Sequence, residues 1–411
     1  MRLLAVSYML PPMLYPQAIQ IGRLLAHVDA EIGAVSGRTV GGGKGLDCYA
    51  DLDRKFAFHL DVPHQPRLRG LPFHFARRFL PLYARIPDEY RPWVPVAERV
   101  AIAKLAETGF EPDVLVTFGE PMSDHLLGLR LKRRLGLPWV AHFSDPWVDN
   151  PFRAGDVLAN RINRRCERDT IAAADRVIFT SRETLDLVMS KYPSSWRSKT
   201  DVLPHSFDPA LYPAEPIRRD RIVIRHLGNF YGARTPYPLM RALRTLWDRD
   251  RASLDGVDVE LVGRVQTGMR WHPAYRALPE GLVKVRGTVP YSESLRLMSE
   301  ADLLLVMDAP ADLSVFLPSK LIDYLGSGTA VMGIVPPGTS ASLLKRLGGS
   351  VADPRRPEEV VTALRSAIDA ARRERVTGRG RPWGVPAVRQ EFQPERTAAA
   401  FLDILRRAAR R

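Results

Sequence analysis

The stretch Leu317–Val331, LPSKLIDYLGSGTAV, combines a short predicted helix with the start of an apolar strand. Pro318 and Ser319 favour a helix start, and the two glycines near the end favour a helix stop. A short helix that leads straight into an apolar run is typical of an α/β protein. Lys320 and Asp323 lie on one face of this helix. They form either a local ion pair, worth about 0.2–0.5 kcal/mol, or part of a ligand site.

Apolar runs alternate with amphipathic segments on both sides of this stretch. The alternation predicts strands connected by helices, and therefore doubly wound parallel sheets. The predicted strands are Leu3–Tyr8, Glu31–Ser36, Asp113–Phe118, Trp139–Phe143, Arg176–Thr180, Asp201–Leu203, Arg221–Leu227, Val257–Val262, Val283–Arg286, Leu303–Met307 and Ala330–Ile334. Ser181 and Ser292 are predicted to be the N-caps of the helices that follow them.

A proline-rich segment at residues 204–216 interrupts the alternation and is predicted to be a linker. It divides the chain into an N-terminal Rossmann-like domain over residues 1–205 and a C-terminal one over residues 206–393. Residues 394–411 form a basic amphipathic helix that we expect to pack back on the N-terminal domain. Because ligands of such folds bind at the carboxyl ends of parallel strands, we expect the two domains to face a central cleft.

Length and composition narrow the class of protein. A chain of 411 residues suggests two or three domains, and its hydrophobic content of 45% is that of a globular protein. It contains no apolar run of 18 residues, and its N-terminus is interpreted as a strand rather than a signal peptide. Two cysteines are too few for a disulfide framework, so we expect a cytoplasmic protein.

A net charge of +14 favours anionic partners such as nucleotide diphosphates and lipid headgroups. No nucleic-acid-binding motif occurs, and no nucleic acid partner is expected. Residues 64–95 interleave arginines with aromatic and aliphatic side chains. This segment either lies in a membrane interface, which would make the protein a peripheral protein of the cytoplasmic membrane face, or forms a helix packed on the domain.

Several segments, in this order and spacing, resemble the retaining, nucleotide-sugar-dependent glycosyltransferases of the GT-B fold, family 4 (glycosyl transferases group 1). The matching segments are Asp113–Trp147, Ala174–Thr184, Leu203–Tyr212, His226–Pro236, Leu261–Val265, Val285–Met307 and Pro318–Met332. The resemblance implies a hexosyltransferase with two Rossmann-like domains. Its C-terminal domain would bind a nucleotide-diphosphate sugar such as a UDP- or GDP-sugar, and its N-terminal domain would hold the acceptor.

The resemblance assigns roles to the opening stretch. Asp323 takes the position of the acidic residue that binds the ribose hydroxyls, and Lys320 lies near a helix N-terminus that suits phosphate oxygens. The first acidic residue of the family's pair would fall at Val315, so it is missing here. Residues that the resemblance places around the donor are Gly228, Asn229, Arg264, Phe316, Leu317, Pro318, Ser319 and Asp323.

Catalysis in this family requires fixed positive charge at the leaving diphosphate. Arg234 and Lys320 are the predicted pair, with Arg264 as a third candidate. No Asp-x-Asp motif or clustered His/Asp set ends a predicted strand, so we expect no cofactor and no metal requirement.

On the acceptor side, Asp145 follows a predicted strand. It either orients or deprotonates the acceptor hydroxyl, or it serves as a helix cap or loop-ordering carboxylate. Glu120, His142 and Trp147 are further acceptor-side candidates, whereas His125 is predicted to be structural.

Four functions are considered, and we expect the first of them. The first is transfer to a lipid-linked or polysaccharide-precursor acceptor, and the second is glycosylation of small molecules. The third is a GT-B epimerase, which would turn over the donor without an acceptor. The fourth is a degenerate GT-B protein that binds without catalysis.

Overall fold

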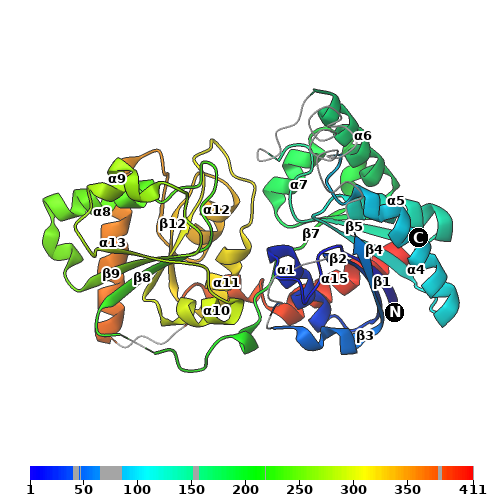
Figure 1. The fold of residues 1–411 in the computed structure, drawn as a ribbon, viewed down its shortest axis with the longest axis horizontal. Helices are drawn as coiled ribbons and strands as arrows, with labels where there is room; N and C mark the ends of the chain where they lie inside the picture. Colours follow the sequence, from blue (N-terminus) through cyan, green and yellow to red (C-terminus); the bar gives the residue numbers. More distant parts are fainter. Residues whose placement is uncertain are drawn as a thin grey trace. The chain divides into compact units, whose positions relative to one another are not determined.

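The structure is a computed structural model that describes residues 1–39, 46, 48–64, 86–150, 157–217, 219–377 and 382–410. Most of the basic segment predicted at residues 64–95 lies outside the described residues, and its two interpretations stay predictions. The chain divides into two compact units (Figure 1). Unit 1 comprises Met1–His205 and Pro394–Arg411, and unit 2 comprises Ser206–Gln393.

Unit 1 is built on a parallel sheet in the order β3-β2-β1-β4-β5-β6-β7. Its strands are β1 (Arg2–Val6), β2 (Glu31–Thr39), β3 (Phe56–His64), β4 (Val114–Gly119), β5 (Trp139–Phe143), β6 (Arg176–Phe179) and β7 (Thr200–Val202). Its helices are α1 (Pro16–His27), α4 (Val94–Thr108), α5 (Ser123–Leu135), α6 (Val157–Ala173), α7 (Arg182–Met189) and α15 (Pro394–Ala409).

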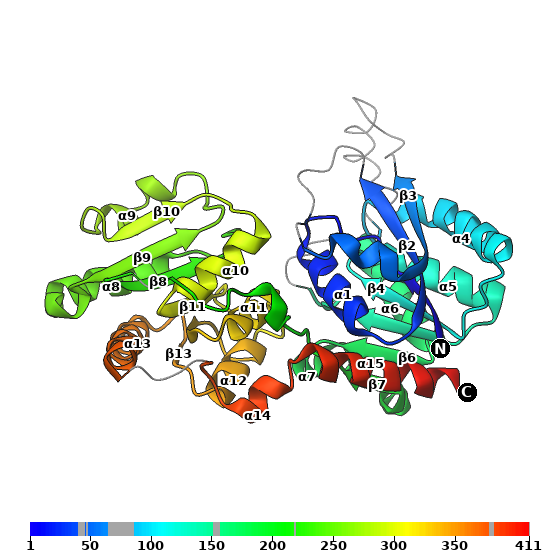
Figure 2. The same ribbon diagram turned by 90° about the horizontal axis from the view of Figure 1, so that it is seen from below.

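Each face of this sheet carries its own hydrophobic core, because successive side chains of a strand point to opposite faces. Leu4 and Val6 of β1 pack into a core that includes α4 and α5. Leu3 and Ala5 pack on the other face, together with α1 and with Phe401 of α15. The C-terminal helix therefore belongs to unit 1, where it lies beside α1 (Figure 2).

Unit 2 has a second parallel sheet in the order β10-β9-β8-β11-β12-β13. Its strands are β8 (Ile222–Leu227), β9 (Val257–Val262), β10 (Val283–Arg286), β11 (Leu303–Met307), β12 (Ala330–Ile334) and β13 (Val351–Ala352). Its helices are α8 (Tyr237–Arg249), α9 (Pro273–Arg276), α10 (Tyr291–Glu300), α11 (Ser319–Ser327), α12 (Thr339–Arg346), α13 (Pro357–Thr377) and α14 (Pro386–Gln390). One core lies on each face of the sheet.

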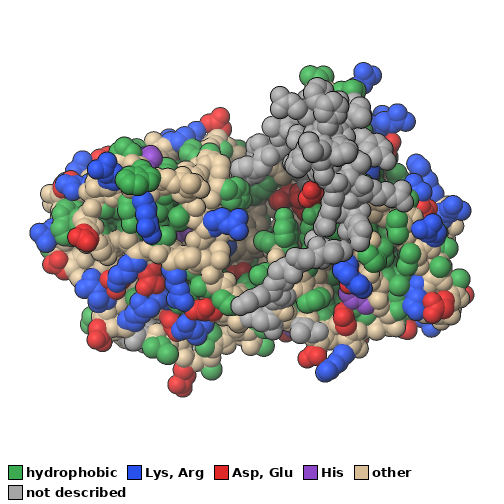
Figure 3. Space-filling model, in the orientation of Figure 1, with side chains coloured by type: hydrophobic (Ala, Val, Ile, Leu, Met, Phe, Trp, Pro, Cys, Tyr) green, Lys and Arg blue, Asp and Glu red, His purple; other side chains and the backbone are tan. Residues whose placement is uncertain are grey.

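Short 3-10 helices complete the connections in both units. They are η1 (Ala50–Lys55), η2 (Arg91–Trp93), η3 (Ser194–Lys199), η4 (Pro209–Leu211), η5 (Arg251–Leu254) and η6 (Met269–Trp271). In the part of the chain that the structure describes, no helix is long and apolar enough to span a bilayer. On the side of unit 2 seen in Figure 3, Lys and Arg side chains are interspersed with Asp and Glu and form no continuous basic patch.

The predicted α/β fold with two Rossmann-like domains is confirmed. The sequence prediction missed strands β3 and β13, and Ser292 is not an N-cap, because α10 already begins at Tyr291 with Pro290 in the cap position. Gly328 ends α11 in the left-handed conformation, with a φ of 67°. Gly326 lies inside that helix, where a Cβ atom would come 2.3 Å from the Tyr212 hydroxyl.

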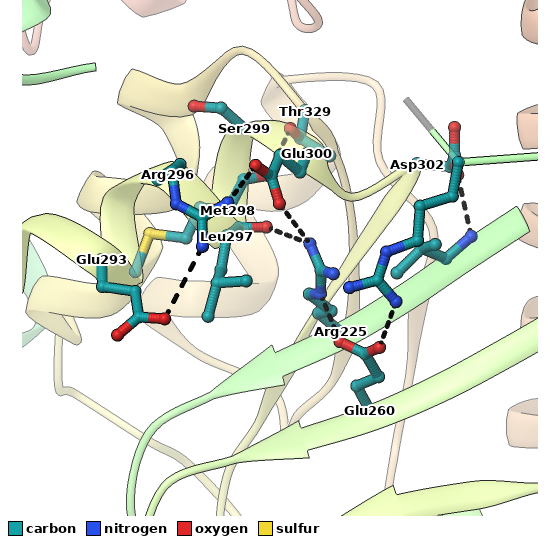
Figure 4. A network of polar contacts seen from close by, with 12 residues as sticks. Arg225, Glu260, Glu293, Arg296, Leu297, Met298, Ser299, Glu300, Asp302 and Thr329 are labelled. Atoms are coloured by element: carbon teal, nitrogen blue, oxygen red, sulfur yellow. Dashed lines mark hydrogen bonds and ion pairs between the residues drawn. The ribbon is translucent and has the colours of Figure 1, made fainter. Parts of the chain in front are cut away.

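A charged network is buried between the sheet and α10 of unit 2 (Figure 4). Arg225 of β8 is fully buried and donates from Nε to Glu260 on β9, at 2.7 Å, and from Nη1 to the Leu297 carbonyl, also at 2.7 Å. Glu300 of α10 lies 3.8 Å from the same guanidinium. Burial alone would raise the pKa of Glu260, but hydrogen bonds and charge from Arg225 and Arg219 lower it below its ordinary value.

The cap of α7 gives a stability prediction. Ser181 accepts a hydrogen bond from the Thr184 amide at 3.0 Å, as its predicted N-cap role requires. Ser181→Ala should therefore lower the free energy of unfolding by about 1 kcal/mol. Ser190→Ala, which removes an exposed hydroxyl at the other end of α7, is the matched control and should cost less. Equal urea midpoints for Ser181→Ala and wild type would contradict the prediction.

Candidate functional site

The carboxyl ends of the parallel strands β8, β9 and β11 meet at one edge of the unit 2 sheet. Gly228, Gly263 and Asp308 directly follow these three strands. The chain that leaves β11 then forms α11, which carries Lys320 back to Gly228. Residues far apart in sequence are therefore brought together at the edge where α/β sheets bind their ligands.

The Lys320 ammonium is buried beside Gly228. Part of the Lys320 side chain is exposed, but its Nζ atom is buried and makes no hydrogen bond within the described residues, to Asp323 or to any other group. A Cβ atom at position 228 would lie 2.6 Å from Nζ, and Gly228 has a φ of 145°. Burial first, and then the charge of Arg234, lower the pKa of Lys320 to about 7, although Asp308 partly offsets them. The interpretation of Lys320 and Asp323 as a local ion pair is wrong.

Arg234 is held by Asp308. Its Nε and Nη2 atoms donate to one Asp308 carboxylate oxygen, at 3.1 and 2.8 Å, and its Nη1 donates to the Tyr231 hydroxyl at 2.9 Å. Ser314 donates to the second carboxylate oxygen at 3.2 Å. The side chains of Arg234 and Asp308 are both buried. Asp308 thus fixes the guanidinium of Arg234 and has little capacity left to neutralise Lys320.

His226 of β8 is the third buried nitrogen group at this edge. Its Nδ1 lies 2.8 Å from the Leu305 carbonyl, which can only accept, so Nδ1 carries the proton. Its Nε2 is buried and has no hydrogen-bond partner among the residues that the structure describes. Burial, together with the charges of Lys320 and Arg234, holds the pKa of His226 well below its ordinary value. The imidazole is therefore neutral, and Nε2 can only accept.

Asp323 is buried on α11 and contacts two tyrosines. One of its carboxylate oxygens accepts from the Tyr291 hydroxyl at 3.1 Å, and its backbone carbonyl accepts from the Tyr212 hydroxyl at 2.8 Å. The next residue, Tyr324, is bound to both backbone groups of Leu227, at 2.7 and 3.1 Å. These contacts fix α11 against the end of β8 and so place Lys320 and Asp323.

The loops after β8 and β9 are bound to each other. Asn229 accepts from the Arg264 amide at 2.9 Å, and the Phe230 amide donates to the Arg264 carbonyl at 2.9 Å. A Cβ atom at Gly263 would lie 2.4 Å from the Gly228 carbonyl oxygen, so only glycine permits this approach. The Arg264 side chain is exposed.

The segment before α11 contains the remaining donor-side candidates. Val315 and Leu317 are buried, and the Val315 carbonyl accepts from Thr339 at 3.0 Å. Phe316 is half-buried, Pro318 is the N-cap residue of α11, and Ser319 is its first residue. The position of the missing acidic residue, Val315, thus belongs to the hydrophobic interior.

In unit 1, the acceptor-side candidates lie at the carboxyl ends of β4 and β5. Glu120 and Asp145 are half-buried in the loops after these strands. His142 is buried on β5, where burial lowers its pKa to about 4. Trp147 is also buried and donates to Asn163 at 2.9 Å, so its contacts are those of a core residue. His125 is buried too and binds Thr117 at 2.8 Å, as a structural residue would.

The structure places Lys320 Nζ beside Gly228 and within electrostatic range of Arg234, with Asp323 one helical turn along α11. Sequence reasoning missed His226, Asp308 and Tyr291. Asp308 directly follows the predicted strand Leu303–Met307, and a polar residue at that place is a general indication of a ligand site. This indication could have identified Asp308. Within the described residues, no group of three or more His, Cys, Asp or Glu side chains could hold a metal ion.

Comparison with known proteins shows which family unit 1 resembles. Residues 47–205 match the family model described as a glycosyl transferase 4-like domain. This segment is therefore similar to glycosyl transferase 4-like domains. It includes the strands and loops of Glu120, His142 and Asp145, so the predicted resemblance is confirmed in unit 1. No curated protein matches the chain in sequence.

Solved structures confirm the GT-B fold for the whole chain. HepE from Anabaena, in complex with UDP and glucose, is 15% identical with a TM-score of 0.61, and the match covers 99% of each chain. Sucrose-phosphate synthase from Thermosynechococcus elongatus is 14% identical with a TM-score of 0.67, over 98% of each chain. A putative UDP-N-acetylglucosamine 2-epimerase from Listeria monocytogenes is 12% identical with a TM-score of 0.58, over 98% of this chain and 95% of its own.

Proposed function

We propose that the chain is a glycosyltransferase that moves a sugar from a nucleotide-diphosphate sugar to a hydroxyl acceptor, with retention at the anomeric carbon. The observation that carries this proposal is the buried Lys320 ammonium at the carboxyl edge of the unit 2 sheet, which has no hydrogen-bond partner among the described residues. A buried cation of this kind requires an anionic ligand for full stabilisation. The similarity of unit 1 to glycosyl transferase 4-like domains supports a nucleotide-sugar as that ligand.

The diphosphate leaving group would meet two cations. Lys320 and the guanidinium of Arg234, fixed by Asp308, would stabilise the charge that develops when the bond to the sugar breaks. Asp323 would accept hydrogen bonds from the ribose hydroxyls, with Tyr291 holding its carboxylate in place. Because two side-chain cations serve the diphosphate, we expect transfer to continue at its full rate in EDTA. Asp145 of unit 1 would orient the acceptor hydroxyl.

The direct test is a thermal-shift panel of UDP-, GDP-, dTDP- and ADP-sugars with the full chain. A true ligand at 100 times its Kd should stabilise the folded chain by about 2.7 kcal/mol, which raises Tm visibly. Nucleotide release should then depend on an added acceptor. Donor turnover without an acceptor would favour an epimerase, and no stabilisation by any member of the panel would contradict the proposed function.

For the acceptor, we propose a lipid-linked or polysaccharide-precursor hydroxyl. The support is the basic character of the chain, whose net charge of +14 favours anionic membrane surfaces. Flotation with vesicles that contain anionic lipid should carry the chain upward, and vesicles of neutral lipid should not. A chain that stays at the bottom with both would favour a small-molecule acceptor instead.

The pKa of Lys320 predicts how donor affinity varies with pH. The ammonium must be charged to bind a diphosphate, and its pKa in the free chain is about 7. Donor affinity should therefore stay high below neutral pH and fall about tenfold between pH 6 and pH 8 as the proton is lost. Calorimetric titration with UDP-glucose, whose diphosphate charge does not change in this range, measures the effect. Lys320→Met should bind weakly with no such dependence, and a pH-independent wild-type affinity would contradict the prediction.

A further inference from the structure

His226 is the group at this edge that the proposed function leaves without a role. Its ring is fully buried, and its orientation is fixed on two sides. The Leu305 carbonyl accepts from Nδ1 at 2.8 Å, and the Phe230 ring stacks on the imidazole with 4.6 Å between centroids. Nε2 lies 3.6 Å from where a Cβ atom at Gly228 would be, and within the described part of the chain it makes no hydrogen bond. A buried acceptor that is left unsatisfied costs stability, and such groups are normally completed by a ligand or an ordered water.

The Lys320 ammonium and the His226 imidazole both lie beside Gly228. A Cβ atom at position 228 would lie 2.6 Å from Lys320 Nζ and 3.6 Å from His226 Nε2. One of these nitrogens donates hydrogen bonds and the other accepts them, and both lack a partner among the described residues. Lys320 as a whole is only partly buried, so we expect its ammonium to turn toward a bound diphosphate, which would leave room next to Nε2.

The chemistry of Nε2 selects the group that can bind there. A phosphate or carboxylate oxygen has only lone pairs to offer, so it would be repelled by an imidazole nitrogen that also only accepts. A hydroxyl group fits, since it can donate to Nε2 and accept from Lys320 at the same time. We propose that His226 is a specificity-determining residue whose Nε2 accepts a hydrogen bond from a hydroxyl group of the bound nucleotide-sugar. This inference rests on the proposed function, and it adds the requirement for a ligand hydroxyl beside the diphosphate.

The hydroxyl can belong to the transferred sugar or to the ribose, and two probes separate these sources. UDP-glucose and UDP are titrated calorimetrically into the full chain and into His226→Phe, which keeps the stacked ring and removes the acceptor. If the thermal-shift panel shows that the chain binds a nucleotide-sugar with another base, that nucleotide-sugar and its nucleoside diphosphate replace UDP-glucose and UDP. For a sugar hydroxyl, the affinity for UDP-glucose should fall about tenfold while that for UDP stays within about twofold. For a ribose hydroxyl, both affinities should fall equally.

Two further variants exclude a merely structural effect. His226→Gln offers an amide oxygen near the position of Nε2 and should recover most of the lost affinity. His272→Phe removes another stacked imidazole of unit 2, 3.5 Å from the Tyr237 ring, and should change neither affinity. Unchanged affinities in His226→Phe, or a loss that His226→Gln does not recover, would overturn the inference while leaving the proposed function intact. A wild-type chain that binds no nucleotide-sugar would overturn both.

Discussion

Lys320→Met should lower kcat/KM for sugar transfer about 100- to 1000-fold. Methionine retains much of the length of the lysine side chain but removes the charge that the leaving diphosphate needs. Loss of a single preorganised group at a developing charge typically costs this much. The measurement is initial rates of nucleotide release at several donor concentrations. Lys345→Met, which removes an exposed lysine of α12, is the matched control and should transfer at the wild-type rate.

The same substitution should not destabilise the fold. The folded chain binds the Lys320 proton with a pKa of about 7, whereas the unfolded chain binds it with the ordinary lysine value of 10.5. The unfolded chain therefore holds more protons between these values, and wild-type stability should rise as the pH increases through 7. Lys320→Met should lack this rise and melt no lower than wild type at pH 7. Wild-type transfer rates in Lys320→Met would contradict the assignment of Lys320 to the diphosphate.

Strands could be read from sequence where apolar residues recur at least at every second position, as in the continuous run LLLVM of β11 and the alternating VDVELV of β9 and VKVR of β10. Strands β5, β9, β10, β11 and β12 have the predicted bounds for this reason. Strand β3 was missed because its sequence, FAFHLDVPH, mixes polar residues and a proline into an edge strand. Two-residue β13 gives no periodic signal. The fold is therefore predictable where apolar residues recur regularly along a strand, which includes the edge strand β10, and less so where a proline or a length of two residues weakens that pattern.

The candidate site was predictable only in part. Local spacing places Lys320 and Asp323 on one helix face, and the residue types suggest a ligand. The spacing could not predict which partners these side chains have. Asp308 accepts hydrogen bonds from Arg234 and not from Lys320, and Asp323 accepts one from Tyr291. The role of His226 depends on which of its nitrogens faces a carbonyl, and that depends on the register of β8 against β11. Such pairings between distant segments have no local sequence signal.

Arg225→Met should lower the free energy of unfolding of unit 2 by about 3 kcal/mol or more. The substitution removes the buried cation between Glu260 and Glu300 and leaves each carboxylate with one exposed arginine, Arg219 for Glu260 and Arg296 for Glu300 (Figure 4). Breaking a buried ion pair by removing one partner typically costs about 3–5 kcal/mol. Urea titration of the full chain, with hydrogen exchange followed in the peptide that contains β8, assigns the loss to unit 2. Arg244→Met breaks an exposed pair with Asp248 and should cost about 0.5 kcal/mol or less.

Two further measurements separate charge from packing in this network. The double variant Arg225→Met with Glu260→Leu should be more stable than Arg225→Met alone, because it removes one of the two buried carboxylates that face Arg225 and leaves only Glu300. Since Arg225 and Arg219 lower the pKa of Glu260, its stabilising contribution is present above the ordinary glutamate pKa and is lost as the pH falls through the lowered value. The gap between wild type and Arg225→Met should therefore narrow in acid. A gap that is the same at pH 7 and at pH 3 would mean that Arg225 stabilises unit 2 by packing and not by charge.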